Sequence, residues 1–567
     1  MDATPTKRIL ILQTTRMGDV LQTTPLIHMI RMKHPHAHIA LMVRKMGMAI
    51  AERNPDINEI LLYDEDELYL HLKSNDSDRL LEAYRLAEAE IQALRDKNFD
   101  IVYNVTHSVG SAMVAKLAQI PEVHGAYLSD DWQFILRGNW TNYFFTSVFS
   151  RAYNDLNLCD ITRNIAVDAP PSQALRFALN DEDRAFADSF FTEAGMEEDD
   201  FVVCFQLGAS EENKRWSIEG FAALARILTE ERQARILLLG VKEEQPLGDR
   251  FEAFLPNVAT HLFGKTSIGQ VAALLAKSAI LVTNDTGTMH IAASVQCPIT
   301  LVSVGNVHYR ETGPYGAGHC AIETRRQDLG RSDFVPAALD EREGIQAEQV
   351  YAVMQYVLGH GQEEPAPLLQ DGPDLAKVDI YTTRFAPDGF LQFYPVIQRA
   401  MEERDFLRIA YRAMWLSHLS NVEDPELEAD GLQRMFRHFK GPDSTTVTEW
   451  AAQYATEFSG LAELSQRGIA TTESLVLLLD SKGNLEEAKQ LVSQLMALDE
   501  EARIYGEVNP ASRPLILMAR FERDNLEGAD VMILATTTLN IYRACAERAS
   551  RMVDKVRLLA ERWTTEK

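Results

Sequence analysis

Short apolar runs and longer amphipathic stretches follow one another along residues 8–358. Runs such as 8–12, 201–205 and 279–283 consist almost wholly of aliphatic, aromatic or β-branched side chains, which is typical of strands buried on both faces of a sheet. Between such runs, stretches such as 79–97 place apolar residues at helical spacing. Strands that alternate with helices predict a parallel sheet covered by helices on both faces.

Two stretches rich in proline, glycine and polar residues interrupt this alternation. Asp-Ala-Pro-Pro at 168–171 precedes a second strand–helix series, and Gly-His-Gly-Gln-Glu-Glu-Pro-Ala-Pro at 359–367 follows it. We therefore predict a first Rossmann-like domain at 1–170, a second at 171–362 and a mainly helical extension at 363–567. In the extension, helices are expected at 390–416, 445–464, 472–479, 485–498 and 529–564.

The predicted strands end in loops that hold glycine and polar or charged side chains. The strand at 8–12 is followed by Gly18, which permits a sharp turn, and by Asp19. In open parallel sheets, ligands bind beyond the carboxyl ends of the strands. Asp19 is therefore open to two interpretations, a cap at the start of the next helix or a base at the mouth of the sheet.

A second loop of this kind, at 284–287, follows the strand at 279–283. The free N–H groups of the turn and the positive end of the helix dipole suit a phosphate, with Asp285 and His290 beside it. The alternative is an ordinary strand–helix turn with a capping aspartate. The loop after the strand at 99–104 holds His107, which is either an acceptor contact or a structural histidine.

Composition narrows the class of protein. With 46% hydrophobic and 25% charged residues, no apolar run near the length of a spanning helix and no signal-peptide layout, the chain is expected to be soluble and cytoplasmic. The net charge of −27 argues against binding nucleic acid. The five cysteines form no CxxC pair, and the histidines at 34–38 have no acidic or cysteine partner nearby, so neither a metal nor another cofactor is predicted.

The motifs point to a class of enzyme. The loop at 14–19 lacks the GxGxxG of a dinucleotide-binding fold, and two sheet units with ligand loops indicate instead the GT-B class of sugar-nucleotide enzymes. Five motifs, in their order and spacing across residues 8–358, resemble the heptosyltransferases of glycosyltransferase family 9. They are Ile-Leu-Ile-Leu-Gln-Thr-Thr-Arg-Met-Gly-Asp-Val-Leu-Gln-Thr-Thr-Pro at 9–25, Asn-Lys-Arg-Trp at 213–216, Gly-Lys-Thr-Ser at 264–267, Asn-Asp-Thr-Gly-Thr-Met-His at 284–290 and Thr-Gly-Pro at 312–314.

The resemblance implies an α/β GT-B fold, in which two Rossmann-like domains face each other across a cleft. It implies an inverting glycosyltransferase that moves a heptose from ADP-heptose to a saccharide or lipopolysaccharide-type acceptor, without a required metal. Asp19 is then the general base that takes the proton from the acceptor hydroxyl, and Lys214 neutralises the departing diphosphate. Lys214 would otherwise be a solvated surface lysine.

The remaining site residues follow from the same resemblance. The N–H groups of Thr286 and Gly287 would hold the phosphates, while Asp285 and His290 would hold the sugar hydroxyls. Contacts with the ribose are expected from Glu243 or Glu244, and contacts with the adenine from Gly264 and Lys265.

The sequence departs from the family pattern at Gln22, where many relatives carry histidine, so the acceptor stays open. The extension lies outside the resemblance and is interpreted as an acceptor-docking or oligomerisation module. Peripheral contact with the inner face of the inner membrane and a homo-oligomer also stay open. Two other functions compete, a GT-B-fold sugar-nucleotide epimerase, which needs no acceptor, and a non-catalytic scaffold, which the retention of Asp19 and Lys214 argues against.

Overall fold

The computed structural model describes residues 6–74, 76–165, 173–305, 307–325, 344–359, 375, 377–420, 431–432 and 435–566. Unit 1 comprises Met1–Val102 and Leu156–Gln398, and unit 2 comprises Tyr103–Asp155 and Arg399–Lys567. Unit 2 thus groups part of the predicted first domain with most of the predicted extension, and the three-domain division stays a prediction. The predicted linker at 168–171 and residues 360–367 of the second linker lie outside the described residues.

Unit 1 begins with three parallel strands in the order β3-β2-β1. They are β1 (Arg8–Leu12), β2 (His38–Val43) and β3 (Glu59–Leu62), so the predicted strand at 8–12 is confirmed. Helix α1 (Met17–Lys33) connects β1 to β2. The chain continues through α2 (Met48–Ala51), α3 (Glu65–Leu72) and α4 (Ser77–Asp96) to β4 (Ile101–Asn104), which carries it from unit 1 into unit 2.

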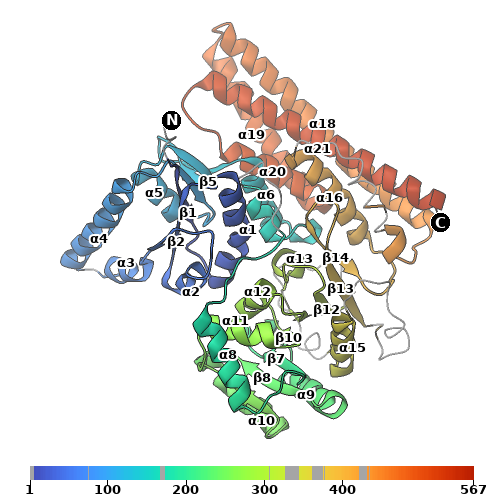
Figure 1. Cartoon of the computed structure of the whole chain (residues 1–567). Helices are drawn as coiled ribbons and strands as arrows, with labels where there is room; N and C mark the ends of the chain where they lie inside the picture. Colours follow the sequence, from blue (N-terminus) through green and yellow to red (C-terminus); the bar gives the residue numbers. More distant parts are fainter. Residues whose placement is uncertain are drawn as a thin grey trace, which may run out of the picture. The chain divides into compact units, whose positions relative to one another are not determined.

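The second half of unit 1 is built on an eight-stranded sheet in the order β14-β13-β12-β11-β10-β7-β8-β9 (Figure 1). The six strands from β12 to β9 in this order are parallel, and β13 and β14 form an antiparallel hairpin at one edge. The strands are β7 (Val202–Gln206), β8 (Arg235–Leu239), β9 (Ala259–His261), β10 (Ile280–Thr283), β11 (Ile299–Ser303), β12 (Cys320–Thr324), β13 (Val378–Phe385) and β14 (Leu391–Pro395). The helices are α8 (Asp181–Glu193), α9 (Ile218–Arg232), α10 (Gln245–Phe254), α11 (Ile268–Lys277), α12 (Gly287–Ser294), α13 (Tyr309–Thr312) and α15 (Ala347–Leu358).

The predicted helix at 390–416 is wrong at its start. Residues 391–395 form strand β14, and the helix that follows is α16 (Glu403–Ser420). The apolar residues at 390, 391, 393 and 394 mimic helical spacing, but all of β14 is buried because it pairs with β13 at the edge of the sheet. Gly389, with a φ of 77°, closes the hairpin turn, a conformation that favours glycine.

Unit 2 combines a small antiparallel pair of strands with a bundle of long helices. Strands β5 (Glu122–Leu128) and β6 (Phe134–Arg137) pair with each other. The aromatic stretch around α6 packs on the bundle, since the Phe145 ring lies against Phe521 and the Tyr143 ring against Trp415, each pair at a tilt. The helices are α5 (Val109–Leu117), α6 (Asn139–Phe149), α16, α18 (Ser444–Asp480), α19 (Leu485–Val508), α20 (Arg513–Asp524) and α21 (Val531–Glu566).

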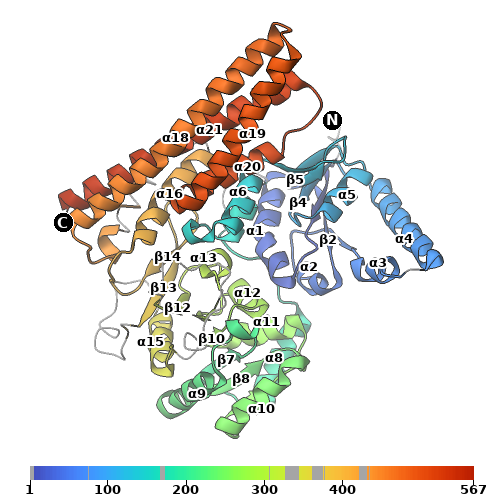
Figure 2. The same ribbon diagram turned by 180° about the vertical axis from the view of Figure 1, so that it is seen from behind.

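The predicted helices at 445–464 and 472–479 are one continuous helix, α18, which runs alongside α21 in both views (Figures 1 and 2). Within the described residues, we find no helix with the length and apolar character needed to cross a membrane.

A buried ion pair fastens helix α7 (Leu158–Arg163) to the β13–β14 hairpin. The Arg163 guanidinium lies 2.9 Å from the Asp160 carboxylate, and neither side chain is reached by solvent to any extent. Asp160 accepts hydrogen bonds from the Tyr315 hydroxyl and from the Leu391 N–H, each at 2.8 Å, and Arg163 donates to the Gly389 carbonyl at 2.9 Å. Because each charge is both paired and hydrogen-bonded, its burial is tolerated.

Removing one partner of this pair should therefore be costly. We expect Arg163→Met to lower the free energy of unfolding by about 3–5 kcal/mol, since it leaves the Asp160 carboxylate buried without its cation. As a control, Arg235→Met removes a partly exposed pair with Asp200 and should cost less than about 1 kcal/mol. Urea unfolding of the full chain followed by tryptophan fluorescence would measure both, and equal losses would contradict this account.

Candidate functional site

The first candidate element is the turn from β1 into α1. Asp19 is the third residue of α1 and is half-buried, and its Oδ2 accepts a hydrogen bond from the Arg16 N–H at 3.1 Å. Asp19 therefore caps its own helix, where the helix dipole favours a carboxylate. Capping does not exclude a chemical role, because it occupies only one of the two carboxylate oxygens.

The second candidate element is the turn from β10 into α12, which Asn284 organises. Asn284 is fully buried, and its side-chain oxygen accepts a hydrogen bond from the Trp216 N–H at 2.9 Å. Its Nδ2 donates to the carbonyl groups of Gln206, Leu207 and Gly208 at 3.0–3.3 Å. Asn284 thus joins the ends of β7 and β10 to the segment at 213–216. The alternative of a capping aspartate at this turn is wrong, because α12 has Thr286 at its N-cap position.

The first turns of α1 and α12 touch each other. A Cβ added to Gly18 would lie 3.2 Å from Cδ2 of His290, and a Cβ added to Gly287 would lie 2.5 Å from the Met17 methyl. Each helix therefore places a glycine where a side chain of the other helix needs room. The structure places Gly18 against His290 and Gly287 against Met17, and the role of these turns as one shared site stays a prediction.

Asp285 lies in the electrostatic field of this site. The pKa of its carboxyl group is raised to about 6, mainly by burial and to a smaller extent by the Asp19 carboxylate. The Lys214 ammonium, a hydrogen bond from the Thr312 hydroxyl and the Arg16 guanidinium act in the opposite direction. Three of the other four sequence motifs therefore contribute a side chain that acts on this one carboxylate.

The phosphate-side residues lie around the same turn. Lys214 is at the end of a short 3-10 helix (Glu212–Lys214), mostly buried, and its Nζ lies 3.2 Å from Glu211. The hydroxyl of Thr286 lies 3.3 Å from that of Thr283. Burial lowers the pKa of the His290 imidazole to about 4, so this ring is neutral near pH 7.

The predicted nucleoside contacts separate into two groups. Glu243 is exposed, whereas Glu244 is half-buried and its Oε2 accepts a hydrogen bond from Nε2 of Gln206 at 3.0 Å. Gly264, with a φ of 65°, donates its N–H to the Gly240 carbonyl at 2.9 Å, so the third motif closes against the loop after β8. Nζ of Lys265 donates to the His261 carbonyl at 2.8 Å.

His107 belongs to unit 2, and its role as an acceptor contact stays a prediction. Its ring stacks on Phe144 with ring centres 4.4 Å apart, and burial lowers the pKa of the imidazole to about 4. Its φ of 56° is unusual for a residue other than glycine.

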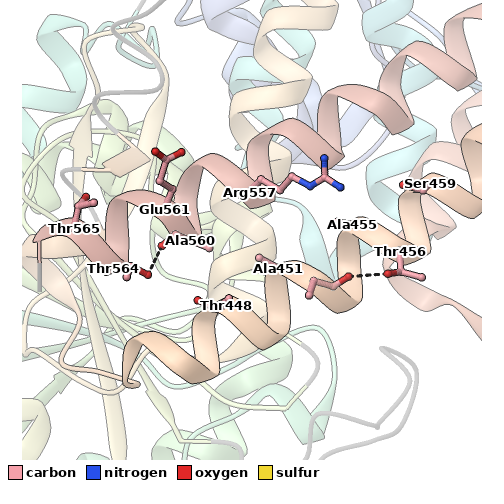
Figure 3. A pocket seen from close by; sticks show the side chains of 11 residues that line it. Thr448, Ala451, Ala455, Thr456, Ser459, Arg557, Ala560, Glu561, Thr564 and Thr565 are labelled. Atoms are coloured by element: carbon pink, nitrogen blue, oxygen red, sulfur yellow. Dashed lines mark hydrogen bonds between the residues drawn. The ribbon is translucent and has the colours of Figure 1, made fainter.

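A surface groove of about 720 Å³ lies between α18 and α21 (Figure 3), and its lining is less suited to catalysis than the turns at α1 and α12. Its lining is largely alanine, threonine and serine, with Arg557 and Glu561 as its charged members. The hydroxyls of Thr456 and Thr564 donate to carbonyl groups of their own helices at 2.9 Å. In the described part of the chain, no group of three or more metal-binding side chains is found.

Comparison with known proteins decides the family. Residues 88–329 match the sequence profile of glycosyltransferase family 9 (heptosyltransferase). This part of the chain belongs to the family. Lipooligosaccharide heptosyltransferase 2 of Haemophilus influenzae is 25% identical over 303 residues, which cover 51% of this chain and 81% of the relative. Lipopolysaccharide heptosyltransferase 2 of Escherichia coli is 24% identical over 304 residues, which cover 52% and 81%.

The fold is shared with a solved structure. The crystal structure of a family 9 glycosyltransferase from Veillonella parvula matches with a TM-score of 0.50 at 23% identity, over 62% of this chain and 97% of that one. The chain is a glycosyltransferase with the GT-B fold, so the predicted fold class, family and enzyme class are confirmed.

Sequence reasoning missed several residues of this family 9 site. Gln206 and Thr288 hydrogen-bond each other and connect to Glu244, while Arg16 and Thr312 act on Asp285. Thr312 lies within a motif that signalled it. For Gln206 the sequence holds no comparable signal, because its partners lie 38 and 82 positions away.

The raised pKa of Asp285 makes stability depend on pH in a defined direction. The folded chain holds the Asp285 proton more tightly than the unfolded chain, so the cost of ionisation grows as the pH rises from about 4 to 6 and then levels off. We expect Asp285→Asn to be more stable than the natural chain at pH 8, by at most about 3 kcal/mol, with the difference shrinking towards pH 5. Thermal unfolding of both proteins between pH 5 and 8 would measure this. A difference that does not change with pH would show that Asp285 is not desolvated.

Proposed function

We propose that this family 9 glycosyltransferase moves a heptose from ADP-heptose to a saccharide or lipopolysaccharide-type acceptor, with inversion and with Asp19 as the general base. The observation that carries the proposal is the contact between the first turns of α1 and α12, which puts Asp19, Asp285 and Lys214 into one electrostatic group. The names of the relatives, lipooligosaccharide and lipopolysaccharide heptosyltransferase 2, supply the transferred sugar and the acceptor class. ADP-heptose as the donor is what the resemblance of the motifs to the family implies.

The nucleotide end of the donor suits the α12 side of the site. The N–H groups of Thr286 and Gly287 start the helix and present partial positive charge, which favours a diphosphate. Lys214 adds a full positive charge from the loop after β7 and offsets the charge that builds up on the leaving ADP. Gly264 and Lys265, which close against the loop after β8, are proposed for the adenine.

The sugar end suits the carboxylate and imidazole beside this turn. With a pKa of about 6, Asp285 is ionised above that pH and accepts hydrogen bonds from sugar hydroxyls. The neutral His290 ring offers one nitrogen as donor and one as acceptor. Both side chains then orient the anomeric carbon towards α1, since Gly18 lies directly against His290.

In the transfer step, the acceptor oxygen attacks the anomeric carbon from the face opposite the ADP. A new bond forms between that carbon and the acceptor oxygen, the bond to the β-phosphate oxygen breaks, and its electron pair leaves with ADP. Asp19 takes the proton of the acceptor hydroxyl. An acceptor of the lipopolysaccharide type lies at a membrane, so we propose action in the cytoplasm at the inner face of the inner membrane.

Asp19→Asn tests the base. The amide still accepts the hydrogen bond from the Arg16 N–H but cannot take a proton at neutral pH, so we expect turnover to fall about 10²–10⁴-fold. ADP affinity, measured by calorimetry, should stay within about twofold. Product formation from ADP-heptose and an oligosaccharide acceptor would be followed by mass spectrometry.

Two outcomes of that experiment would redirect the assignment. Undiminished turnover in Asp19→Asn would remove Asp19 as the base. If the natural chain converts ADP-heptose to an isomer without any acceptor, the epimerase alternative replaces the transferase.

Lys214→Met tests the diphosphate contact. Loss of the ammonium should weaken ADP binding by at least about tenfold, because a charge-assisted hydrogen bond to phosphate is lost. Lys277→Met, at the end of α11 and paired with Asp188, is the matched control and should bind ADP like the natural chain. If calorimetry gives both variants the affinity of the natural chain, Lys214 does not contact the diphosphate.

A further inference from the structure

Gln206 uses both ends of its side-chain amide to connect two loops of the site. It is the last residue of β7 and only 3% of its surface is exposed. Its Nε2 donates to Oε2 of Glu244 at 3.0 Å, and its Oε1 accepts from the Thr288 hydroxyl at 3.0 Å. A carboxylate only accepts and a hydroxyl can donate, so the two partners fix the orientation of the amide. The loop after β8 is thereby tied to the first turn of α12.

The Glu244 carboxylate is held firmly at one oxygen and left open at the other. Oε2 also accepts from the Val241 N–H at 3.1 Å. A Cβ on Gly240 would lie 2.5 Å from Oε2, and a Cβ on Gly208 would lie 1.6 Å from Oε1. The carboxylate therefore occupies space that a side chain at either glycine would fill. Within the described residues, no hydrogen bond is donated to Oε1. A carboxylate oxygen of this kind, beyond the carboxyl ends of parallel strands, suits a ligand hydroxyl.

We propose that Gln206 is a positioning residue that aims Oε1 of Glu244 at the ribose hydroxyls of a nucleoside diphosphate. This rests on the proposed function, in which the nucleotide occupies these loops. Through Thr288, the same amide ties the ribose contact to the turn that holds the diphosphate. Ribose and diphosphate are therefore recognised at a spacing that Gln206 sets, and the site selects ribonucleotides over 2′-deoxyribonucleotides.

The test compares ADP with 2′-deoxy-ADP by calorimetry on the full chain. We expect the natural chain to bind ADP at least about tenfold more tightly, because the deoxynucleotide leaves the carboxylate oxygen without its donor. In Glu244→Gln and in Gln206→Met this ratio should fall to about 1–3. Thr288→Val removes the outer support only and should lower the ratio by a smaller factor.

A double variant shows whether Gln206 acts through Glu244. If it does, the double variant Gln206→Met, Glu244→Gln should bind ADP as tightly as the single variant with the lower ADP affinity. The second change then removes no further interaction, because both changes abolish the same contact. Gln92→Met is the matched control, because Gln92 also donates to a carboxylate, Asp96, but on the exposed face of α4. It should keep the nucleotide ratio of the natural chain.

The nucleotide ratio separates positioning from general damage. A loosened fold weakens ADP and 2′-deoxy-ADP by the same factor and leaves their ratio unchanged, so an unchanged ratio in Gln206→Met overturns the inference. If Gln206→Met does not fold, an unchanged ratio in Thr288→Val overturns it instead. A natural chain that binds ADP but does not discriminate refutes the inference and leaves the proposed transfer standing. A natural chain that binds neither nucleotide refutes both.

Discussion

The contact between the first turns of α1 and α12 is the constraint on which the candidate site depends. Two helix N-termini, each with unsatisfied N–H groups and partial positive charge, approach because Gly18 and Gly287 present no side chain to His290 and Met17. The positive ends lower the cost of placing the two carboxylates, Asp19 and Asp285, near each other. A nucleotide sugar suits this arrangement, since its diphosphate needs the positive ends and its hydroxyls need the carboxylates.

Neutral amides hold the loops that surround this contact. Asn284 joins three carbonyl groups at the end of β7 to the N–H of Trp216, and Gln206 joins Glu244 to Thr288. An amide donates and accepts at once, so it can fix a loop without adding a charge to the site. Asn284 and Gln206 thereby fix the spacing between the strand ends, and the charged side chains of the site remain available to bind the ligand.

The sequence was sufficient for the elements that short-range pattern determines. The strand at 279–283 and the helix after it are predicted from spacing, and the motifs led to Asp285 and His290. It could not choose between Glu243 and Glu244, because that choice depends on a single 3-10 turn (Lys242–Glu244) that turns one of them towards Gln206. It also misassigned residues 391–395, which form β14. This strand pairs with β13, and β13 joins the sheet by pairing with β12, a long-range contact that local spacing does not encode.

Two aspartates of unit 1 show how the fold separates structural from functional charge. Asp160 is fully buried, paired with Arg163 at 2.9 Å and supplied with two further hydrogen bonds, so its capacity to accept is used within the fold. Asp285 has a hydrogen bond from Thr312 and two cations acting on it, yet its pKa stays near 6, above the ordinary value of 3.8. Its charge is thus incompletely compensated by the protein. A carboxylate kept in that state favours whatever supplies the missing donors, and the hydroxyls of a sugar are donors of the required kind.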